Sequence, residues 1–184
     1  MVTPVSPLTA QGCRVSLARM TRIVLLGPAG SGKTTLARQL GERAKLPVIC
    51  LDDIWRPEWT KDDVPGFRAL MREAHAGERW VSDGNFAAAT FDIRLPRATL
   101  IVWLERPRWL CALRAMGRVV RQDNDHRIGG LVKVLRFIAN FERVNRPLIE
   151  TLRIEHGSNV PITRLKSNRE VDAFVRDWVA KAAA

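Results

Sequence analysis

The stretch LLGPAGSGKTTLA, residues 25–37, contains a glycine-rich loop followed by a lysine and two threonines. It is the most informative part of the sequence for the fold. Within it, residues 27–34 (GPAGSGKT) fit the pattern GxxxxGK[ST], whose backbone N–H groups cradle the phosphates of a nucleotide. An apolar run at 22–26 (RIVLL) precedes the loop as a predicted buried strand, and helical spacing follows at 32–46. This order of strand, loop and helix predicts a phosphate-binding loop (P-loop).

Each residue type in the P-loop has an expected chemical role. Glycine allows the backbone to approach the oxygens of a triphosphate closely, and the helix that begins near Gly32 adds its positive end. Lys33 is expected to reach the β- and γ-phosphates, and the Thr34 hydroxyl to ligate Mg²⁺. The predicted cofactors are therefore ATP, or another nucleoside triphosphate, and Mg²⁺. The predicted nucleotide contacts in the loop are Gly27, Pro28, Ala29, Gly30, Ser31, Gly32, Lys33, Thr34 and Thr35.

Apolar runs alternate with helical patterns along the rest of the chain. Further strands are predicted at 48–51, 79–82, 99–104 and 161–165, and helices at 62–76, 107–121, 130–155 and 168–182. Strands interleaved with helices predict an α/β fold of three layers, in which a five-stranded parallel sheet is covered on both faces. Ligands bind beyond the carboxyl ends of the strands in such sheets.

Length and composition favour one domain. Residues 1–20 are interpreted as a flexible tail with Met20 as an alternative start, and 21–184 as a single P-loop kinase-like domain with a short helical lid around 115–147. The net charge of +11 predicts attraction to polyanions. Three cysteines without metal-ligand spacing favour a cytoplasmic location. No apolar run approaches the roughly 20 residues that a membrane span needs, so no membrane partner is expected.

Acidic residues end two of the predicted strands. Asp83, followed by Gly84, is the best candidate for a carboxylate that orients Mg²⁺. Asp52 and Asp53 end the strand after the P-loop helix, where one of the pair is expected to accept a proton from an attacking hydroxyl or to orient that hydroxyl. The alternative is that these carboxylates cap a helix or lie in a solvated turn.

Arginines recur on two predicted helices. Arg114, Arg118 and Arg121 share one face of the first helix, and Arg136, Asn140 and Arg143 repeat that spacing on the second, with Arg146 adjacent. Such faces are expected to stabilise the charge of a transferring phosphoryl group or to bind nucleic-acid phosphates. The alternative is a solvated face on which the charges never converge. The polar segment 122–130 between the helices has the character of a short lid.

Three further features have open or simple interpretations. Trp55 and Trp59 either stack on a planar substrate or pack the mouth of the core. Glu105 is expected to pair with Arg106 or Arg108, and His126 to be an exposed loop residue.

Several segments together resemble the small adenylate-kinase-like P-loop proteins known as DNA topology modulation proteins. The resemblance covers about 21–179 and rests, besides the P-loop, on LDDIWRPEW, WVSDGNF, DIRLPRATLIVWLERPRWLCALRAMGR, LRFIANFERVNRP and LKSNREV. It implies a nucleoside-monophosphate-kinase-like core that binds ATP and Mg²⁺ and transfers a phosphoryl group. It also implies that Arg94, Arg118 and Arg121 face phosphate and that the turn at 166–168 borders the adenine through Ser167 and Asn168. The turn after Asp83 lacks the proline and arginine that true adenylate kinases carry there.

The favoured function is an ATP-dependent kinase for an unidentified small molecule or nucleotide. One alternative is a regulatory ATPase that binds nucleic acid through the basic helices, and another is a nucleotide-binding module without turnover. The expected catalytic residues are Lys33, Asp53, Arg118 and Arg121, and the expected metal-site residues are Thr34 and Asp83. The expected substrate-binding residues are Asp52, Asp53, Trp55, Asp83, Arg94 and Arg143.

Overall fold

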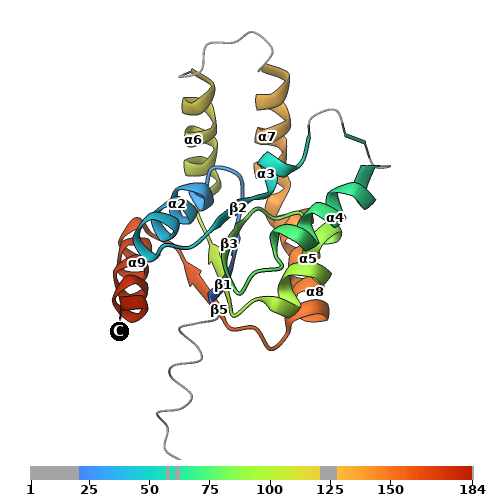
Figure 1. The fold of residues 1–184 in the computed structure, drawn as a ribbon. Coiled ribbons are helices and arrows are strands. Elements are labelled where there is room, and N and C mark those ends of the chain that lie inside the picture. The colour runs from blue at the N-terminus through green and yellow to red at the C-terminus, as the bar shows by residue number, and fades with distance from the viewer. Residues whose placement is uncertain (1–20, 57–58, 61–62, 121–127, 184) are drawn as a thin grey trace, which may run out of the picture.

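A five-stranded parallel sheet forms the centre of the molecule. The computed structural model describes residues 21–56, 59–60, 63–120 and 128–183, so the expected tail 1–20 lies outside the described residues (Figure 1). The strands follow the order β2-β3-β1-β4-β5, which confirms the predicted parallel sheet. They are β1 (Thr21–Leu26), β2 (Val48–Cys50), β3 (Arg79–Asp83), β4 (Leu100–Leu104) and β5 (Ile162–Leu165).

Helices connect the strands and cover both faces of the sheet. The α-helices are α2 (Lys33–Ala44), α3 (Leu51–Ile54), α4 (Val64–Ala74), α5 (Ala87–Arg94), α6 (Arg108–Val120), α7 (Ile128–Asn140), α8 (Arg146–Gly157) and α9 (Asn168–Ala183). A short 3₁₀-helix η2 (Leu95–Arg97) follows α5, and a π-helix η4 (Phe141–Asn145) separates α7 from α8.

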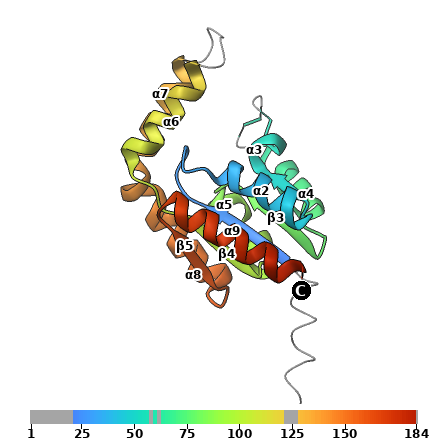
Figure 2. The same ribbon diagram turned by 90° about the vertical axis from the view of Figure 1, so that its left-hand side faces the viewer.

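The side chains of β1 divide between two cores, as the alternation of a strand requires. Ile23 and Leu25 pack with α2 and α9 on one face. Val24 and Leu26 pack with α4, α5 and α8 on the other. Figures 1 and 2 show the resulting three layers, which confirm the predicted architecture.

The helices differ from the prediction in several places. α3 was not predicted, and it begins at Leu51, which was expected to end the strand 48–51. The expected helix at 130–155 consists of α7, η4 and α8, because five residues of π-helix interrupt it. α5 was not predicted. Its buried positions 87, 90, 91 and 94 have helical spacing, but two of them carry Thr90 and Arg94, so the sequence shows no apolar stripe.

α6 and α7 form a hairpin beyond the carboxyl ends of the strands (Figures 1 and 2). Its own core is small: Cys111, Ala115 and Ile138 are buried together, with Ala29 and Val134 packed against them. The segment 121–127 that joins the two helices lies outside the described residues. Within the described part of the chain, none of the helices has both the length and the apolar character needed to cross a membrane.

Candidate functional site

The P-loop has the curled conformation that its glycines allow. Gly30 has a φ of 78° and Gly32 a φ of 101°, a region that side-chain-bearing residues rarely adopt. A Cβ on Gly30 would also collide with the carbonyl oxygen of Cys111 in α6. The loop is therefore held between β1 and the base of α6, and only glycine fits at this contact.

Lys33 folds back over the loop that precedes it. Its Nζ donates hydrogen bonds to the carbonyl oxygens of Gly27, at 2.8 Å, and Pro28, at 2.9 Å. The Ser31 Oγ is buried and makes no hydrogen bond within the described residues. A buried hydroxyl without a partner costs free energy unless a ligand supplies one, so the loop is suited to an oxyanion.

Thr34 and Asp83 meet at the start of α2. The Thr34 Oγ1 donates to the Asp83 Oδ2 at 2.6 Å, which leaves the hydroxyl lone pairs available to a cation. The other carboxylate oxygen, Oδ1, is buried and has no hydrogen-bond partner in the described part of the chain, and Asp83 is 3% exposed. A hydroxyl, a carboxylate and neighbouring phosphate oxygens are ligands that Mg²⁺ prefers, so these residues fit the predicted metal.

A cleft with a volume of about 1280 Å³ opens at this end of the sheet. Its floor is the P-loop and the turn after β3, and its walls come from α3, α5, the α6–α7 hairpin, α8 and the start of α9. Polar residues that line it include Lys33, Thr34, Gln39, Asp52, Asp83, Asn85, Arg106, Arg114, Asn145, Asn168 and Asp172. The structure thus brings the P-loop, the β3 carboxylate and Asn168 to one cavity, whereas Ser167 is not among its lining residues.

Arg106 organises the α9 side of the cleft. Its Nη1 donates to the Lys166 carbonyl at 2.8 Å, and its Nη2 donates to the Asn168 Oδ1 at 3.0 Å. Burial, aided by the neighbouring charge of Arg114, lowers the pKa of the Arg106 guanidinium. The Arg114 Nη1 lies 3.5 Å from the Ser31 carbonyl oxygen, so this arginine of the predicted basic face does reach the P-loop.

The turn before α9 is fixed by a reciprocal cap. The Glu170 N–H donates to the Ser167 Oγ at 3.1 Å, and the Lys166 N–H donates to the Glu170 carboxylate at 2.7 Å. This arrangement is close to a capping box, with Ser167 as the capping residue and the return bond made to the N–H of the preceding Lys166. Ser167 and Asn168 stay predictions as adenine contacts.

Asp52 and Asp53 occupy different positions on α3. Both are exposed, but Asp52 lines the cleft and Asp53 is not among the lining residues. The structure therefore brings Asp52 to the cavity but not Asp53, and the expected roles of both carboxylates stay predictions.

Trp55 packs into the mouth of the core. Its ring lies edge-on to Phe67 with centroids 5.2 Å apart, and edge-on to Trp59 at 5.7 Å. Of the two alternatives left open by the sequence, this geometry supports packing, and Trp55 is not among the residues that line the cleft.

Arg94 corrects the expectation of a phosphate-facing arginine. Its side chain is fully buried, and its guanidinium donates to the Ser82 Oγ at 3.1 Å, to the Gly84 carbonyl at 2.9 Å and to the Asn85 carbonyl. Burial, which the charge of Asp83 opposes, lowers the pKa of Arg94 to about 9. The residue binds the turn after β3 from inside the protein.

Of the remaining arginines in the predicted site, the structure describes the side chain of Arg143 alone. Arg143 is exposed on η4 and does not line the cavity. Arg118 belongs to α6, but its side chain is not described, and Arg121 and His126 lie outside the described residues. Their expected roles stay predictions.

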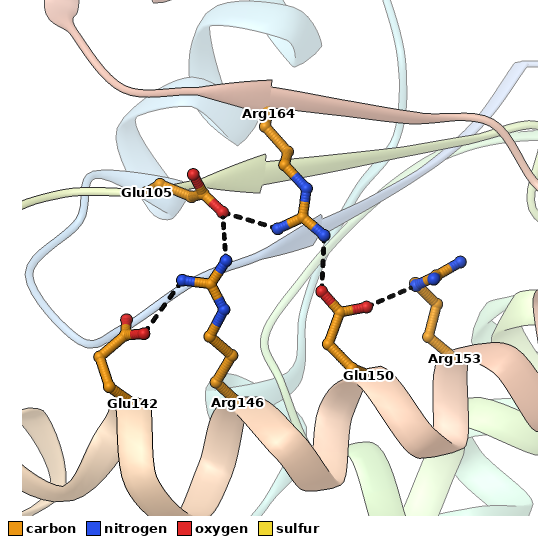
Figure 3. A network of polar contacts seen from close by, with 6 residues as sticks. All are labelled: Glu105, Glu142, Arg146, Glu150, Arg153 and Arg164. Carbon is orange, nitrogen blue, oxygen red and sulfur yellow. Dashed lines mark hydrogen bonds and ion pairs between the residues drawn. The ribbon is translucent and has the colours of Figure 1, made fainter.

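Glu105 pairs with partners far along the chain. Its Oε1 accepts from Arg146 at 2.7 Å and from Arg164 at 2.6 Å, which corrects the expected pairing with Arg106 or Arg108. Figure 3 shows the larger network, which Glu142, Glu150 and Arg153 complete. The network fastens the start of α8 to β5 and to the end of β4.

Asn85, Arg106 and Asn145 line the cleft but were not predicted. Asn85 follows Asp83-Gly84, so its position just after a strand end was the available signal. The sequence gives no comparable signal for Arg106 and Asn145, because their positions depend on the packing of α8 and of the turn at 166–168.

Comparison with known proteins supports the same fold. No protein-family model matches the chain. Adenylate kinases from Kocuria rhizophila and Nocardioides sp. are 40% identical over 58 residues and 39% identical over 57 residues. These matches span 32% and 31% of this chain, and only 30% and 29% of the two relatives.

Solved structures match over nearly the whole chain. A shikimate kinase from Acinetobacter baumannii superposes with a TM-score of 0.56 at 19% identity, over 90% of this chain and 94% of the other. A gluconokinase from Sinorhizobium meliloti gives 0.51 at 19% identity, over 90% and 93%. A shikimate kinase from Bacteroides thetaiotaomicron gives 0.54 at 23% identity, over 89% and 99%. The chain therefore has the three-layer α/β fold of P-loop kinases.

Proposed function

We propose that this chain is a phosphotransferase that uses ATP, or another nucleoside triphosphate, and Mg²⁺ to phosphorylate a small molecule. The observation that carries the proposal is the Thr34–Asp83 pair at the mouth of a curled P-loop, because a structural turn has no need of a buried, half-satisfied carboxylate. The kinase folds and the partial adenylate-kinase matches support the same activity.

Each residue of the P-loop region has a proposed role in binding phosphate or Mg²⁺. The P-loop amides and Lys33 bind the β- and γ-phosphates, and Lys33 exchanges its two carbonyl partners for phosphate oxygens. Thr34 and Asp83 would hold Mg²⁺, which when bound neutralises charge on the phosphates. Arg114 lies at the edge of the loop, where it can bind the same oxygens.

Asp52 is the proposed base for the acceptor. The acceptor oxygen forms a bond to the γ-phosphorus as the bond to the bridging oxygen breaks, the nucleoside diphosphate leaves, and the acceptor proton passes to Asp52. Asp52 is suited to this step because it lines the cleft that contains the P-loop. The identity of the acceptor and the resemblance to DNA topology modulation proteins stay predictions.

The test of phosphate binding is the Lys33→Ala variant. Saturating ATP with Mg²⁺, at 100 times its dissociation constant, should stabilise the wild-type protein by about 2.7 kcal/mol, and the variant should lose that stabilisation. Arg38→Ala, an exposed cation on the same helix, is the matched control and should keep it. An unchanged response in Lys33→Ala would remove the role assigned to this lysine.

The test of transfer is a screen of hydroxyl-bearing acceptors for ATP consumption. With a productive acceptor, Asp52→Asn should lower kcat by about 10²- to 10⁴-fold. Asp53→Asn, its exposed neighbour, should change kcat little. The reverse ranking would restore the original assignment of the base to Asp53.

A second candidate function is nucleic-acid binding through the basic helices. Lys133 and Arg136 on α7 and Arg143 on η4 are exposed, and the net charge of the chain is +11. Binding that rests on phosphate contacts should weaken steeply with salt. An affinity for single- or double-stranded DNA that does not change with salt, or that survives replacement of all three cations, would contradict this candidate.

A further inference from the structure

The turn after β3 is held by a buried cation that no described carboxylate binds through a hydrogen bond. Arg94 is fully buried, and its hydrogen-bond acceptors are the Ser82 hydroxyl and the carbonyls of Gly84 and Asn85. Burying a guanidinium is costly unless its hydrogen bonds are made. Its retention at this point therefore needs a structural or functional reason.

Asn85 carries the connection from the turn to the P-loop. The Gly27 N–H donates to the Asn85 Oδ1 at 3.2 Å, and the Asn85 Nδ2 donates to the Gly27 carbonyl at 2.9 Å. The same carbonyl accepts a hydrogen bond from the Lys33 Nζ. One amide side chain thus pairs with both main-chain groups of the first glycine of the loop.

The interior end of the connection is fixed by His75. The His75 Nδ1 lies 2.8 Å from the Met71 carbonyl, which can only accept, so this nitrogen carries the proton. The Nε2 then accepts from the Ser82 hydroxyl at 2.8 Å, and the Ser82 oxygen accepts from Arg94. With a neutral imidazole, the direction of each hydrogen bond from Met71 through His75 and Ser82 to Arg94 is therefore determined.

We propose that Arg94 and Asn85 are positioning residues that hold Asp83 and the P-loop in register before a nucleotide binds. Asp83 lies between Ser82 and Gly84, both of which Arg94 binds, so its carboxylate is fixed relative to Thr34. Asn85 extends this control to Gly27. The inference rests on the proposed function, because it assigns these residues to the phosphate site of that reaction.

Preorganisation gives the proposal a measurable consequence. A loop that is already in its binding conformation loses less entropy when phosphate binds. Without the Asn85 side chain, Gly27 loses two hydrogen bonds, and the loop gains conformations that do not bind phosphate. The affinity for phosphate should therefore fall even where the protein remains folded.

The experiment measures binding of inorganic tripolyphosphate with Mg²⁺ by calorimetry, because this probe reports the phosphate site without a base or an acceptor. Asn85→Ala should bind about tenfold more weakly than wild type, the effect of losing about 1.4 kcal/mol, and Arg94→Met should show a comparable loss. Leu95→Ala is the matched control, since Leu95 is fully buried beside Arg94 but makes none of these polar contacts.

Leu95→Ala should lower the unfolding midpoint yet bind tripolyphosphate within about twofold of wild type. All measurements are made well below each midpoint, so that stability alone cannot weaken binding. If Arg94→Met does not fold, Asn85→Ala still decides the question, because Asn85 is only partly buried at the surface of the cleft. Equal affinity in Asn85→Ala and wild type would overturn the positioning role, whereas no binding by wild type would instead reject the proposed function.

Discussion

Two sides of the cleft are built in opposite ways. The β3 side of the floor, called the β3 wall below, is a continuous set of hydrogen bonds that runs from His75 through Ser82 and Arg94 to Asn85 and the P-loop. Among its described side chains, the α6–α7 wall has a buried cluster of three, and several of its apolar residues remain in solvent, including Trp109 at 65% and Val132 at 59% exposure.

This difference indicates which part of the site is rigid. Local stability follows buried apolar contacts and protected hydrogen bonds, and the β3 wall has both. We therefore expect the phosphate-binding floor to be preformed, whereas the hairpin is the part of the site that can rearrange around a ligand. Three sets of substitutions test this difference in rigidity.

The largest expected effect is a contrast between two core truncations. Phe91→Ala, on the inner face of α5, should cost about 3–5 kcal/mol of global stability, because Phe91 is fully buried in the larger core. Ile138→Ala should cost about 2 kcal/mol or less, because its cluster is small and can open locally. Denaturant unfolding measures both values.

Hydrogen exchange distinguishes the two truncations further. Ile138→Ala should increase exchange in α6 and α7 while β1 and β3 stay protected. A global loss of protection in Ile138→Ala would show that the hairpin and the sheet unfold as one unit, and the contrast between the walls would then be wrong.

The next effect is the response of the β3 wall to acid. Burial lowers the pKa of His75 to about 4, so the unfolded chain takes up a proton below about pH 6.5 that the folded chain does not. The stability that neutral His75 contributes is thus complete above about pH 6.5 and is lost as the pH falls toward 4. Between about pH 7 and pH 4.5, this group should cost about 2–3 kcal/mol.

His75→Gln isolates this contribution. Urea unfolding at the two pH values should show a smaller acid loss in the variant than in wild type, because glutamine does not titrate. Identical losses in the two proteins would mean that His75 is not buried as a neutral group.

The smallest effect concerns Asp83, the proposed metal ligand. Asp83→Asn keeps an oxygen for the Thr34 hydroxyl but removes the charge, so Mg²⁺-dependent ATP binding should weaken by about 10- to 100-fold. Binding in the presence of a chelator should change much less. Asp53→Asn, an exposed carboxylate, serves as the control, and an equal loss in both variants would indicate a general effect of charge.

Local patterns predicted much of the floor of the site. The P-loop, the five strands and Asp83 could be found from the sequence because each depends on residues close along the chain. The glycine spacing requires a curled loop, and the parallel register that aligns Leu25 with Asp83 brings the two strand ends together. Local sequence patterns and the order of the strands were therefore sufficient to predict this part of the molecule.

The side chains that depend on tertiary packing could not be predicted in the same way. Arg94 was expected to face a phosphate because of the family resemblance, and nothing in the neighbouring sequence indicates that α5 turns its side chain inward. Glu105 was expected to pair with its neighbours, yet its partners Arg146 and Arg164 are 41 and 59 residues away. Such contacts arise only once α8 and β5 are in place.

The six-residue ion network ties α8 and, through Glu142, the π-helix to one another. Arg146 and Glu150 fasten α8 to the sheet, and the π-helix at 141–145 is the first irregular backbone between this attachment and the hairpin. α7, which extends from the π-helix, has 13 residues and is about 20 Å long. A rotation of about 10° at the π-helix would displace the far end of α7 by about 3–4 Å, roughly the width of one water layer.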